Sequence, residues 1–483
     1  MQKEVTIVGA GPGGLTCAYW LGTRFGISTR VHESSAVVGG ISQTVLRDGY
    51  RFDIGGHRFF TKVETVENLW HEILDEDDFL LRPRLSRIYY KNRYFDYPLK
   101  PLNALLNLGI FESIACVLSY LFVKINRPSK SDQNTFEGWV AARFGWRLYR
   151  TFFKTYTEKV WGIPARNIQA DWAAQRIKNL NLLKAILNAF SFKKTNVTSL
   201  IEEFQYPKFG PGQMWEKCAS KIKELGSTIS FNSQAIEISR ESSGGISVLF
   251  SDGQRHTSKF VVSTMPINNL IQIISEPVPP KAILDAAKRL KHRDFLTVAL
   301  VVPRHFGFPD NWIYVHSPDV KLGRIQNFLS WSPYMIPNEN MTCLGLEYFV
   351  NEGDELWAMP DQDLIEFASN ELSKIGIVPV KEIVKGFVVR VPKAYPVYDA
   401  EYTESLNLVK EWLSKELPNI LPVGRNGMHR YNNQDHSMMT AILTAENIAT
   451  ASSHDIWSVN VDEEYHESGD KVSGTGRSAP FHA

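Results

Sequence analysis

The feature that most constrains this chain is a glycine triplet between a short apolar run and a helical segment near the N-terminus. Residues 5–8 form the apolar run, and Gly9, Gly11 and Gly14 follow at G-x-G-x-x-G spacing. In this pattern the first glycine permits a tight turn, the second lets backbone approach a pyrophosphate, and the third lets the helix pack on the strand. The order of strand, turn and helix predicts an α/β fold with a Rossmann-like dinucleotide-binding domain.

An acidic residue and a second glycine pair indicate which dinucleotide the motif binds. Glu33 ends the second apolar run, at a place where a carboxylate can accept hydrogen bonds from a ribose 2′-hydroxyl. We therefore expect a dinucleotide without a phosphate on that ribose. Gly39 and Gly40 add a second point of close approach, which is typical of FAD-binding members of this fold. The motif predicts FAD; the alternative is that the glycines only pack a helix on a sheet.

Composition sets limits on the partners and the compartment. The 483 residues suggest about three domains. Lysine plus arginine number 53 and acidic residues 52. The net charge of +1 therefore gives no long-range electrostatic attraction for nucleic acid or an anionic membrane. The four cysteines form no C-x-x-C pair, which argues against a metal site or a disulfide framework. We expect a cytoplasmic protein without a signal peptide.

One stretch tests the prediction of a cytoplasmic protein. Residues 102–123 contain only one charged side chain, Glu112, and the length would suffice to cross a bilayer. Polar residues and a glycine interrupt the stretch. We expect a buried or membrane-touching helix pair rather than a membrane span. Any contact with a membrane would then be peripheral.

The chain between the glycine motif and residue 169 predicts two hairpins and a helical region. Residues 47–62 read as a hairpin strand leading into a loop with Gly55, Gly56 and His57, where backbone can lie flat against a ring system. His57 there is either structural or placed to face a flavin. Residues 86–97 read as a second hairpin, and the aromatic side chains that follow at helical spacing should mostly be core.

The second half predicts a return to the cofactor domain and a substrate-side sheet. A helix at 209–226 precedes strands at 227–231, 235–240, 246–250 and 259–266. A further sheet is expected at 296–302, 312–315, 324–331, 343–350 and 383–391, with helices at 361–375 and 404–417. A strand and a glycine turn then lead to a helix that opens near Asp435, whose carboxylate could cap it. Its N-terminus could stabilise a phosphate or a reduced flavin.

These elements predict a discontinuous cofactor domain. Its three parts are residues 1–80, 193–275 and 419–465, and the substrate side comprises a hairpin at 81–100, a helical subdomain at 101–192 and a sheet domain at 276–418. Residues 466–483 are polar and aperiodic, so we expect a disordered tail.

Five stretches together resemble the UDP-galactopyranose mutases, especially the eukaryotic type, within the amine oxidase and protoporphyrinogen oxidase superfamily of FAD proteins. They are DIGGHRFF, TEKVWGIP with ADWAAQR, KFVVSTMP, RIQNFLSWSP and GRNGMHRYNNQDHS. The last is the most specific, and the resemblance runs from Glu4 to about Ile448. It implies an enzyme in which N5 of reduced FAD attacks the anomeric carbon of a nucleotide sugar, so that pyranose and furanose forms interconvert without net redox change. NAD(P)H would be the external reductant.

The resemblance also implies which residues form the site. Arg176 and Arg324 align with two diphosphate-binding arginines, whose guanidinium fork suits phosphate oxygens. Together with His57 they are the catalytic candidates. The remaining substrate-binding candidates are Tyr97, Lys100, Trp161, Trp331, Tyr395, Tyr431 and Asn433. The cofactor-binding candidates are Gly9, Gly11, Pro12, Gly13, Gly14, Glu33, Gly39, Gly40, Ser42, Gly56, His57, Arg425, Gln434 and Asp435.

Departures from the family pattern leave the substrate open. Lys100 stands where the eukaryotic mutases tend to carry glutamine, Ile201 replaces a nucleotide-contacting asparagine, and Trp331 replaces a tyrosine. Flavin and diphosphate positions are retained while base and sugar contacts change. Two other hypotheses remain: an oxidoreductase of the amine oxidase, phytoene desaturase or protoporphyrinogen oxidase type, and a flavin-containing binding protein without turnover. The sugar, the base, the oligomeric state and the reductant stay undetermined.

Overall fold

A parallel sheet is assembled from strands that lie far apart in the sequence. The computed structural model describes residues 5–97, 99, 101–170 and 203–460. The strands stand in the order β20 (Ile420–Pro422), β13 (Phe260–Ser263), β1 (Val5–Val8), β2 (Thr29–His32) and β9 (Thr228–Ser230). The first strand of the chain is therefore in the middle, and all its residues are buried. The predicted α/β fold with a Rossmann-like domain is confirmed.

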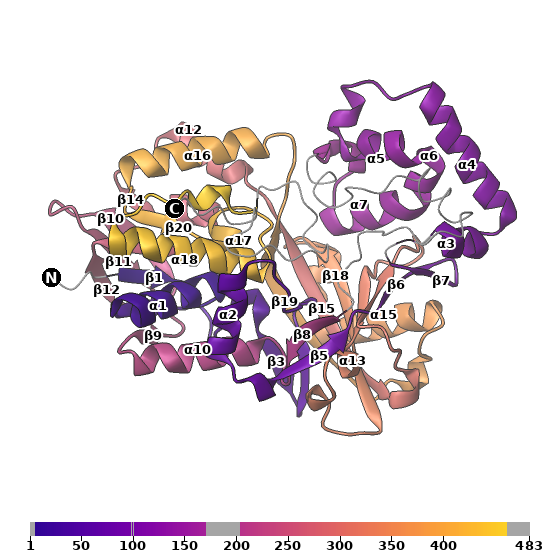
Figure 1. Ribbon diagram of the computed structural model, residues 1–483, viewed down its shortest axis with the longest axis horizontal. Coiled ribbons are helices and arrows are strands. Elements are labelled where there is room, and N and C mark those ends of the chain that lie inside the picture. Colours follow the sequence, from indigo (N-terminus) through magenta and orange to yellow (C-terminus); the bar gives the residue numbers. More distant parts are fainter. Residues whose placement is uncertain (1–4, 98, 100, 171–202, 461–483) are drawn as a thin grey trace.

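Helices from both ends of the chain cover this sheet. The helix α1 (Pro12–Phe25) packs beside α18 (Gln434–Thr450) and α10 (Gly212–Glu224). Figure 1 shows the first two side by side, in indigo and yellow. The buried side chains of the three helices and of β1 form one apolar cluster. Residues at the start and the end of the sequence thus share a core.

A four-stranded sheet continues the same lobe. Its order is β12 (Arg255–Ser258), β11 (Ile246–Phe250), β10 (Ala235–Arg240) and β14 (Ile274–Glu276). Two of the four expected strands, at 228–230 and 260–263, pair in the parallel sheet, and two, β10 and β11, pair here. The strands β12 and β14 were not expected. The segment RHTS of β12 is short and polar, so it carries no apolar alternation.

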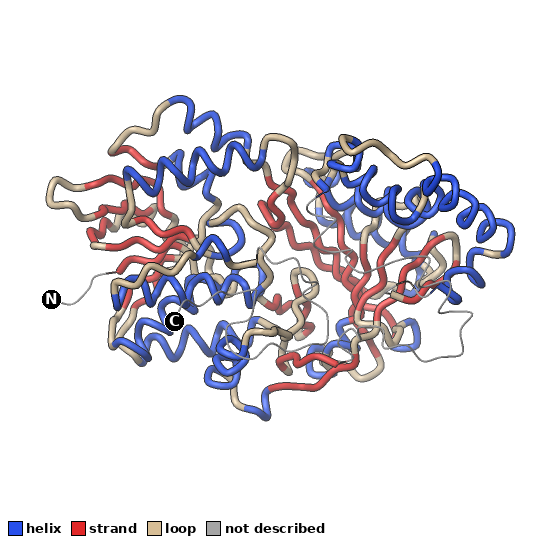
Figure 2. The backbone as a smooth tube through the Cα atoms, turned by 45° about the horizontal axis from the view of Figure 1, so that its top comes forward, coloured by secondary structure: helices blue, strands red, loops and turns tan. Residues whose placement is uncertain are grey.

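The other lobe is built on a seven-stranded sheet (Figure 2). Its order is β19 (Lys385–Pro396), β15 (His292–Pro303), β18 (Met341–Val350), β17 (Arg324–Asn327), β16 (Trp312–Val315), β6 (Ser86–Tyr90) and β7 (Arg93–Asp96). All neighbours are antiparallel except β16 and β6. The predicted hairpin at 86–97 is confirmed, with Lys91 and Asn92 at positive φ in its turn.

One part of this sheet differs from the prediction. The expected strand at 324–331 stops at Asn327, and the helical turn α13 (Phe328–Trp331) follows. Both aromatic residues of that turn are fully buried. An apolar segment of four residues reads as strand or as buried helix equally well, and here core packing decides.

Five helices form the region drawn in purple at the upper right of Figure 1. They are α3 (Pro101–Leu108), α4 (Ile110–Ile125), α5 (Phe136–Phe144), α6 (Trp146–Leu148) and α7 (Thr155–Trp161). The aromatic side chains of Trp139, Tyr149 and Phe152 are buried among them, as expected. The last helix ends at Gly162, two residues before the expected stop at Pro164. Among the helices that the structure describes, none has the length and apolar character needed to cross a bilayer.

Two short antiparallel strand pairs connect the lobes near the glycine loop at residues 55–57. The pair β3 (Thr44–Arg47) and β4 (Tyr50–Asp53) is the predicted hairpin, and β5 (Phe79–Pro83) pairs with β8 (Glu203–Pro207). The fully buried carboxylate of Asp53 accepts hydrogen bonds from the Tyr206 hydroxyl and from Thr44 Oγ1. Burial raises the pKa of Asp53 to about 7. This network fixes the strand that leads into Gly55.

Candidate active site

The first glycine loop needs glycine at two positions for steric reasons. Gly9 has a φ of +98°, and its N–H donates to the His32 carbonyl at 2.8 Å. A Cβ on Gly9 would lie 2.0 Å from Thr264 Oγ1, and a Cβ on Gly14 would lie 1.9 Å from the Gly9 carbonyl oxygen. The loop and the helix α1 can therefore approach the strand only with these residues.

A second loop closes on the first at bare backbone. Gly39 N donates to the Ala10 carbonyl at 2.9 Å. A Cβ on Gly40 would lie 3.4 Å from the Gly11 Cα, so a side chain would fill the gap between the loops. Gly11 is the N-cap of α1, and it supplies no side chain to cap the helix. This leaves a helix N-terminus of the kind that binds pyrophosphate.

Glu33 is held at the end of β2, next to these loops. Its Oε2 accepts from Ala10 N at 2.7 Å, and its Oε1 accepts from Ser35 N at 2.9 Å. The residue is buried. Its carboxylate therefore lies against the first glycine loop, as the ribose-binding prediction requires.

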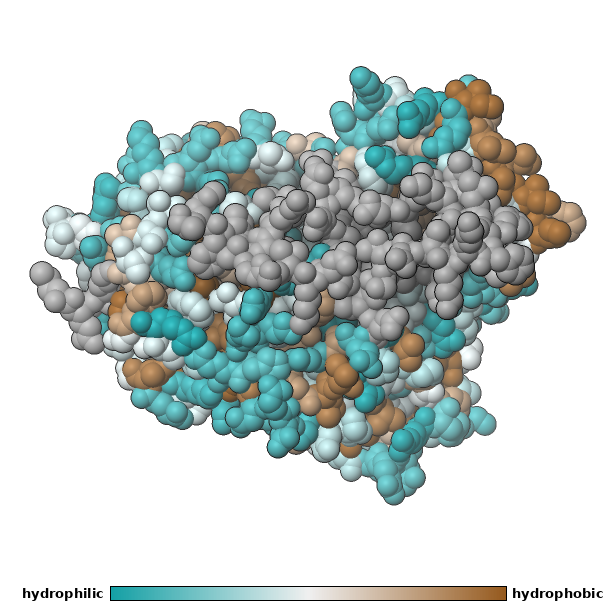
Figure 3. Space-filling view, in the orientation of Figure 1, coloured by the Kyte–Doolittle hydropathy of each residue, from teal (hydrophilic) through white to brown (hydrophobic). Residues whose placement is uncertain are grey.

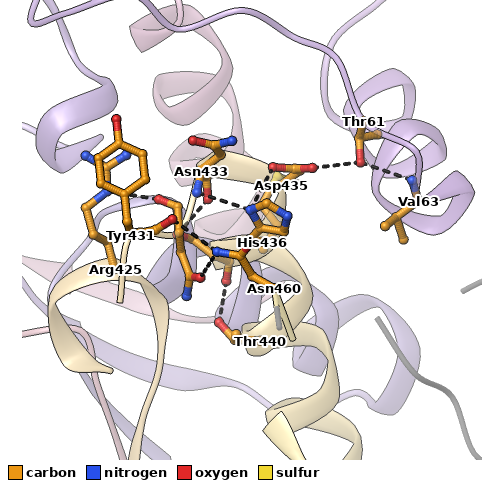
Figure 4. Close-up of polar contacts among 12 residues, drawn as sticks. Thr61, Val63, Arg425, Tyr431, Asn433, Asp435, His436, Thr440 and Asn460 are labelled. Atoms are coloured by element: carbon orange, nitrogen blue, oxygen red, sulfur yellow. Dashed lines mark hydrogen bonds and ion pairs between the residues drawn. The ribbon is translucent and has the colours of Figure 1, made fainter. Parts of the chain in front are cut away.

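The helix α18 brings the C-terminal part of the chain to the site (Figure 4). Its N-cap is Asn433, whose side chain accepts from the N–H of His436 while His436 Nδ1 accepts from Asn433 N at 3.3 Å. The expected cap, Asp435, instead accepts from Thr61 Oγ1 at 3.0 Å. The prediction of Asp435 as the cap was wrong because the cap position falls two residues earlier.

The side chain of Gln434, the first residue of α18, ends in a buried amide. Neither its side-chain oxygen nor its nitrogen has a hydrogen-bond partner in the protein, although both atoms are buried. Buried amides are normally paired. Next to a helix N-terminus, these two atoms fit a ligand that offers both donors and acceptors.

The glycine loop at residues 55–57 lies between the lobes. Gly55 has a φ of +86°, and Gly56 is exposed. His57 Nε2 donates to the Ile54 carbonyl at 2.8 Å. Burial, with a smaller contribution from the guanidinium groups of Arg425 and Arg324, lowers the pKa of His57 to about 4. The imidazole is therefore neutral at neutral pH and adds no charge to the site.

Trp331 packs against Gly56 of this loop and is not exposed to solvent. It is fully buried, and its indole N–H donates to the Asn311 carbonyl at 3.0 Å. A Cβ on Gly56 would lie 3.4 Å from its ring. Trp331 has no exposed surface in this structure, and its expected substrate contact stays a prediction.

Arg324 is the central cation of the site. Its Nε forms an ion pair with Glu347, directly opposite on β18, and its Nη2 donates to the Tyr395 hydroxyl at 3.1 Å. Gln326 donates to the same carboxylate. Burial alone would lower the pKa of Arg324, but Glu347 and the neighbouring tyrosines more than offset this and hold it well above its ordinary value. The guanidinium is fixed in position and always charged.

Aromatic rings surround this cation. Tyr395 stacks on Tyr431 with centroids 5.7 Å apart and planes at 16°. The guanidinium of Arg425 lies 4.8 Å from the Tyr431 ring, and Trp161 lies 6.5 Å from the same ring. Asn460 fixes the backbone here by donating to the Tyr431 carbonyl at 3.1 Å (Figure 4). Residues from three distant segments therefore form one aromatic and cationic surface.

Tyr97 joins the same surface through Tyr314. The two rings are 4.7 Å apart, and Tyr314 is paired in register with Arg324. Tyr156 lies 5.4 Å from Tyr314 on the other side. Two predicted residues, Arg176 and Lys100, and the substituted position Ile201 lie outside the described residues.

Several residues at the site were missed in the sequence. Tyr156 was included among the aromatic side chains assigned to helical core. Glu347 offers a clearer signal, because it is a lone carboxylate inside the apolar run CLGLEYFV. A charge at such a position needs a partner.

The sheet order, the paired glycine loops and the converging helix N-termini define a dinucleotide-binding flavoprotein of the Rossmann type. The chain belongs to the family of flavin-containing amine oxidoreductases, whose model matches residues 12–451. It is an enzyme of this superfamily with FAD as its cofactor, so the predicted cofactor is confirmed.

Solved structures with the same fold have diverse activities. Reduced UDP-galactopyranose mutase is similar with a TM-score of 0.81 and 21% identity, over 94% of this chain and 96% of that one. A putative protoporphyrinogen oxidase from Exiguobacterium sp. 255-15 has a TM-score of 0.71 and 17% identity, over 94% and 100%. A putrescine oxidase mutant has a TM-score of 0.62 and 16% identity, over 94% and 100%. At these identities the likeness shows the fold alone.

The residues present fit FAD. The bare gap between Gly11 and Gly40 suits a pyrophosphate, and Glu33 suits a ribose. The unpartnered amide of Gln434 and the exposed backbone of Gly56 suit a ring system with polar edges.

Proposed function

We propose that the protein is an FAD-dependent mutase that interconverts the pyranose and furanose forms of a nucleoside-diphosphate sugar. The observation that supports this most is the fixed guanidinium of Arg324 within an aromatic surface that also contains Arg425 and the tyrosines 395 and 431. A diphosphate leaving group needs charged donors, and rings suit a sugar or a base. An apolar substrate would have to desolvate these charges at a cost.

The chain's own residues would position and stabilise the leaving group. Arg324 is oriented by Glu347 and Tyr395 before any ligand arrives, so no reorganisation is needed when negative charge develops. The neutral ring of His57, whose N–H is donated to the Ile54 carbonyl, would add no charge at the flavin site. Reduced FAD, when bound, supplies the electron pair that displaces the diphosphate, and NAD(P)H would reduce it.

The other substrate contacts in this proposal come from the resemblance and the geometry together. Tyr97, Trp161, Tyr395 and Tyr431 would bind substrate through the aromatic surface. Asn433 would contribute only what capping leaves available, since its side chain accepts from the His436 N–H. Arg176 and Lys100 complete the proposed contacts.

A second candidate is an oxidoreductase that uses an electron acceptor. The family match and the similarity to a putative protoporphyrinogen oxidase and a putrescine oxidase favour it. It differs from the mutase in one measurable respect, because it consumes an oxidant in proportion to product.

Turnover of nucleotide sugars by the reduced enzyme tests the proposal. The dithionite-reduced holoenzyme would be given UDP-, dTDP- and GDP-sugars, and the ring size of the product read by NMR. We expect ring interconversion of at least one sugar without net use of reductant. Stoichiometric use of oxygen or another acceptor would instead establish the oxidoreductase.

An arginine variant tests the cation separately. Arg324→Ala should weaken nucleotide-sugar binding by about tenfold to a hundredfold, since one charge-assisted hydrogen bond contributes about 1.5–3 kcal/mol. Arg255→Ala is the matched control, because Arg255 forms an exposed ion pair with Glu237. Equal affinity in both variants would contradict the assignment of Arg324.

A further inference from the structure

The helix α4 exposes an apolar face to solvent. Seven large apolar side chains on it are exposed: Ile110, Phe111, Ile114, Leu118, Leu121, Phe122 and Ile125. We call them the α4 face. Phe111 is 87% exposed and Ile125 83%. Figure 3 shows the patch as the brown surface at the upper right edge of the molecule.

Within the part of the chain that the structure describes, the core does not use this face. The opposite side of α4 is the one packed inward, where Cys116, Tyr120 and Val123 are buried. A surface helix of a folded domain normally carries polar side chains on its outer side. A contiguous apolar strip in water is typical of a binding surface.

Exposed basic side chains lie at the C-terminal end of the α4 face, although the whole chain is nearly neutral. Residues 101–170 contain nine lysine and arginine residues and four acidic ones. Lys124 is exposed on α4 itself, and Arg127 and Lys130 are exposed just after its end. Arg147 is half-exposed and paired with Glu112 of α4, to which its Nε donates at 2.6 Å.

We propose that the α4 face docks on the surface of an anionic lipid bilayer. Its apolar side chains would enter the acyl boundary while the lysines and arginines remain at the level of the headgroups, as in interfacial helices. At 16 residues α4 is too short to cross the bilayer and would lie along it. A second copy of the chain fits less well, because its α4 face carries the same basic residues and supplies no negative charge to pair with them.

Vesicle sedimentation of the holoenzyme tests this proposal. The vesicles are phosphatidylcholine alone or phosphatidylcholine mixed with phosphatidylglycerol, at low and at high salt. We expect binding to the mixed vesicles, weaker binding at high salt, and little binding to phosphatidylcholine alone. An absence of binding to the mixed vesicles at low salt would overturn the proposal.

Variants locate the contact on the molecule. Phe111→Glu with Leu118→Glu should reduce vesicle binding at least tenfold, whereas Val278→Glu should leave it unchanged. Val278 is the matched control because it is an apolar side chain 72% exposed on another part of the surface. Arg127→Gln with Lys130→Gln should weaken binding and flatten its salt dependence. Retained flavin absorbance shows that each variant is folded.

Two further measurements distinguish binding to a bilayer from contact with a second copy of the chain. Hydrogen exchange of the wild-type holoenzyme should slow in α4 when mixed vesicles are added, which needs no variant. Sedimentation equilibrium should show that the double glutamate variant and the wild type have the same mass. A wild-type dimer that this variant dissociates, or vesicle binding that the variant keeps, would overturn the proposal.

Discussion

Arg324 keeps its charge inside the protein because Glu347 lies directly opposite it on the next strand. A buried ion pair stabilises little by itself, since both charges have lost their hydration. Removing one partner is costly, because the other charge is then left uncompensated. The pair therefore serves to hold the guanidinium in place, and its value lies in the site rather than in stability.

Replacing Glu347 by Gln should lower both stability and ligand affinity. Glu347→Gln keeps the shape but removes the countercharge, so we expect a loss of about 3 kcal/mol in the free energy of unfolding. The affinity for UDP should also fall, because Arg324 loses the partner that orients its guanidinium before the ligand arrives. Denaturant unfolding and UDP titration measure the two effects. Glu237→Gln, in an exposed pair, should change neither, and an unchanged or higher UDP affinity in Glu347→Gln would contradict this reasoning.

Gly40 and Gly26 form a matched pair of left-handed glycines. Gly40 has a φ of +53° and faces Gly11, while Gly26 has a φ of +63° and nothing within 4 Å of its added Cβ. Both alanine variants should lose about 1 kcal/mol of stability from the backbone alone. Only Gly40→Ala should also lose FAD affinity, measured by flavin fluorescence on titration of the apoprotein. Equal FAD affinity in both would show that the gap is not the cofactor site.

Single residues differ in how far the sequence predicts them. The glycines at positions 9, 11 and 14 could be placed because their spacing follows from the turn and the close approach that a dinucleotide needs. Trp331 could not, since its burial depends on β8 and β16, which are distant in the chain. The pairing of Arg324 with Glu347 likewise depends on strand register, which local sequence does not specify.

At the scale of elements, the N-terminus of α18 combines a helix cap with a buried amide that has no hydrogen-bond partner in the protein. Asn433 and His436 satisfy each other's backbone N–H groups, while Gln434 between them has unpartnered amide atoms. The capping pair sets the direction of the helix, and the unpartnered amide is left to face a ligand. The helix is thus held in place independently of the cofactor.

Two substitutions at the cap test this separation. Asn433→Ala should lower the free energy of unfolding by about 1 kcal/mol, whereas Asn433→Ser, which preserves a capping oxygen, should lose much less. Thermal unfolding of the two proteins measures the difference. If serine were no better than alanine, the Asn433 side chain would not act as a cap.

Elements with strong periodicity could be predicted, and short polar ones could not. The helices at 212–224, 361–374 and 402–416 lie within two or three residues of their expected limits. The strands β12 and β14 were missed because neighbouring strands, rather than their own residues, hold them in a sheet.

At the scale of the whole molecule, five histidines are kept neutral by burial. Burial lowers the pKa of His32, His57 and His429 to about 4, of His316 to about 3 and of His292 to about 2. Below the ordinary pKa of 6.5 the unfolded chain therefore binds more protons than the native protein. Stability is complete above pH 6.5 and falls as the pH drops toward 4. Asp53, with its pKa raised to about 7, acts in the opposite direction as a single group.

A histidine variant measures this acid sensitivity. Between pH 6.5 and 5, each shifted histidine costs the native protein about 2 kcal/mol, at about 1.4 kcal/mol per pH unit. His429→Asn, which suits the positive φ at this position, should therefore reduce the loss of Tm between pH 7 and pH 5. The exposed residue His305 is the control, and His305→Asn should behave as the wild type. An unchanged loss of Tm in His429→Asn would contradict the assignment.

The order β20, β13, β1, β2, β9 has a consequence for biosynthesis. During synthesis β1 lies without its neighbour β13 until some 250 residues later, and the flanking strand at 420–422 and the helix at 434–450 come later still. The seven-stranded sheet, which ends at Pro396, has left the ribosome before these last two elements appear. Flavin can therefore be captured only after the helix at 434–450 has emerged, because a nascent chain that stops before residue 434 lacks part of the site.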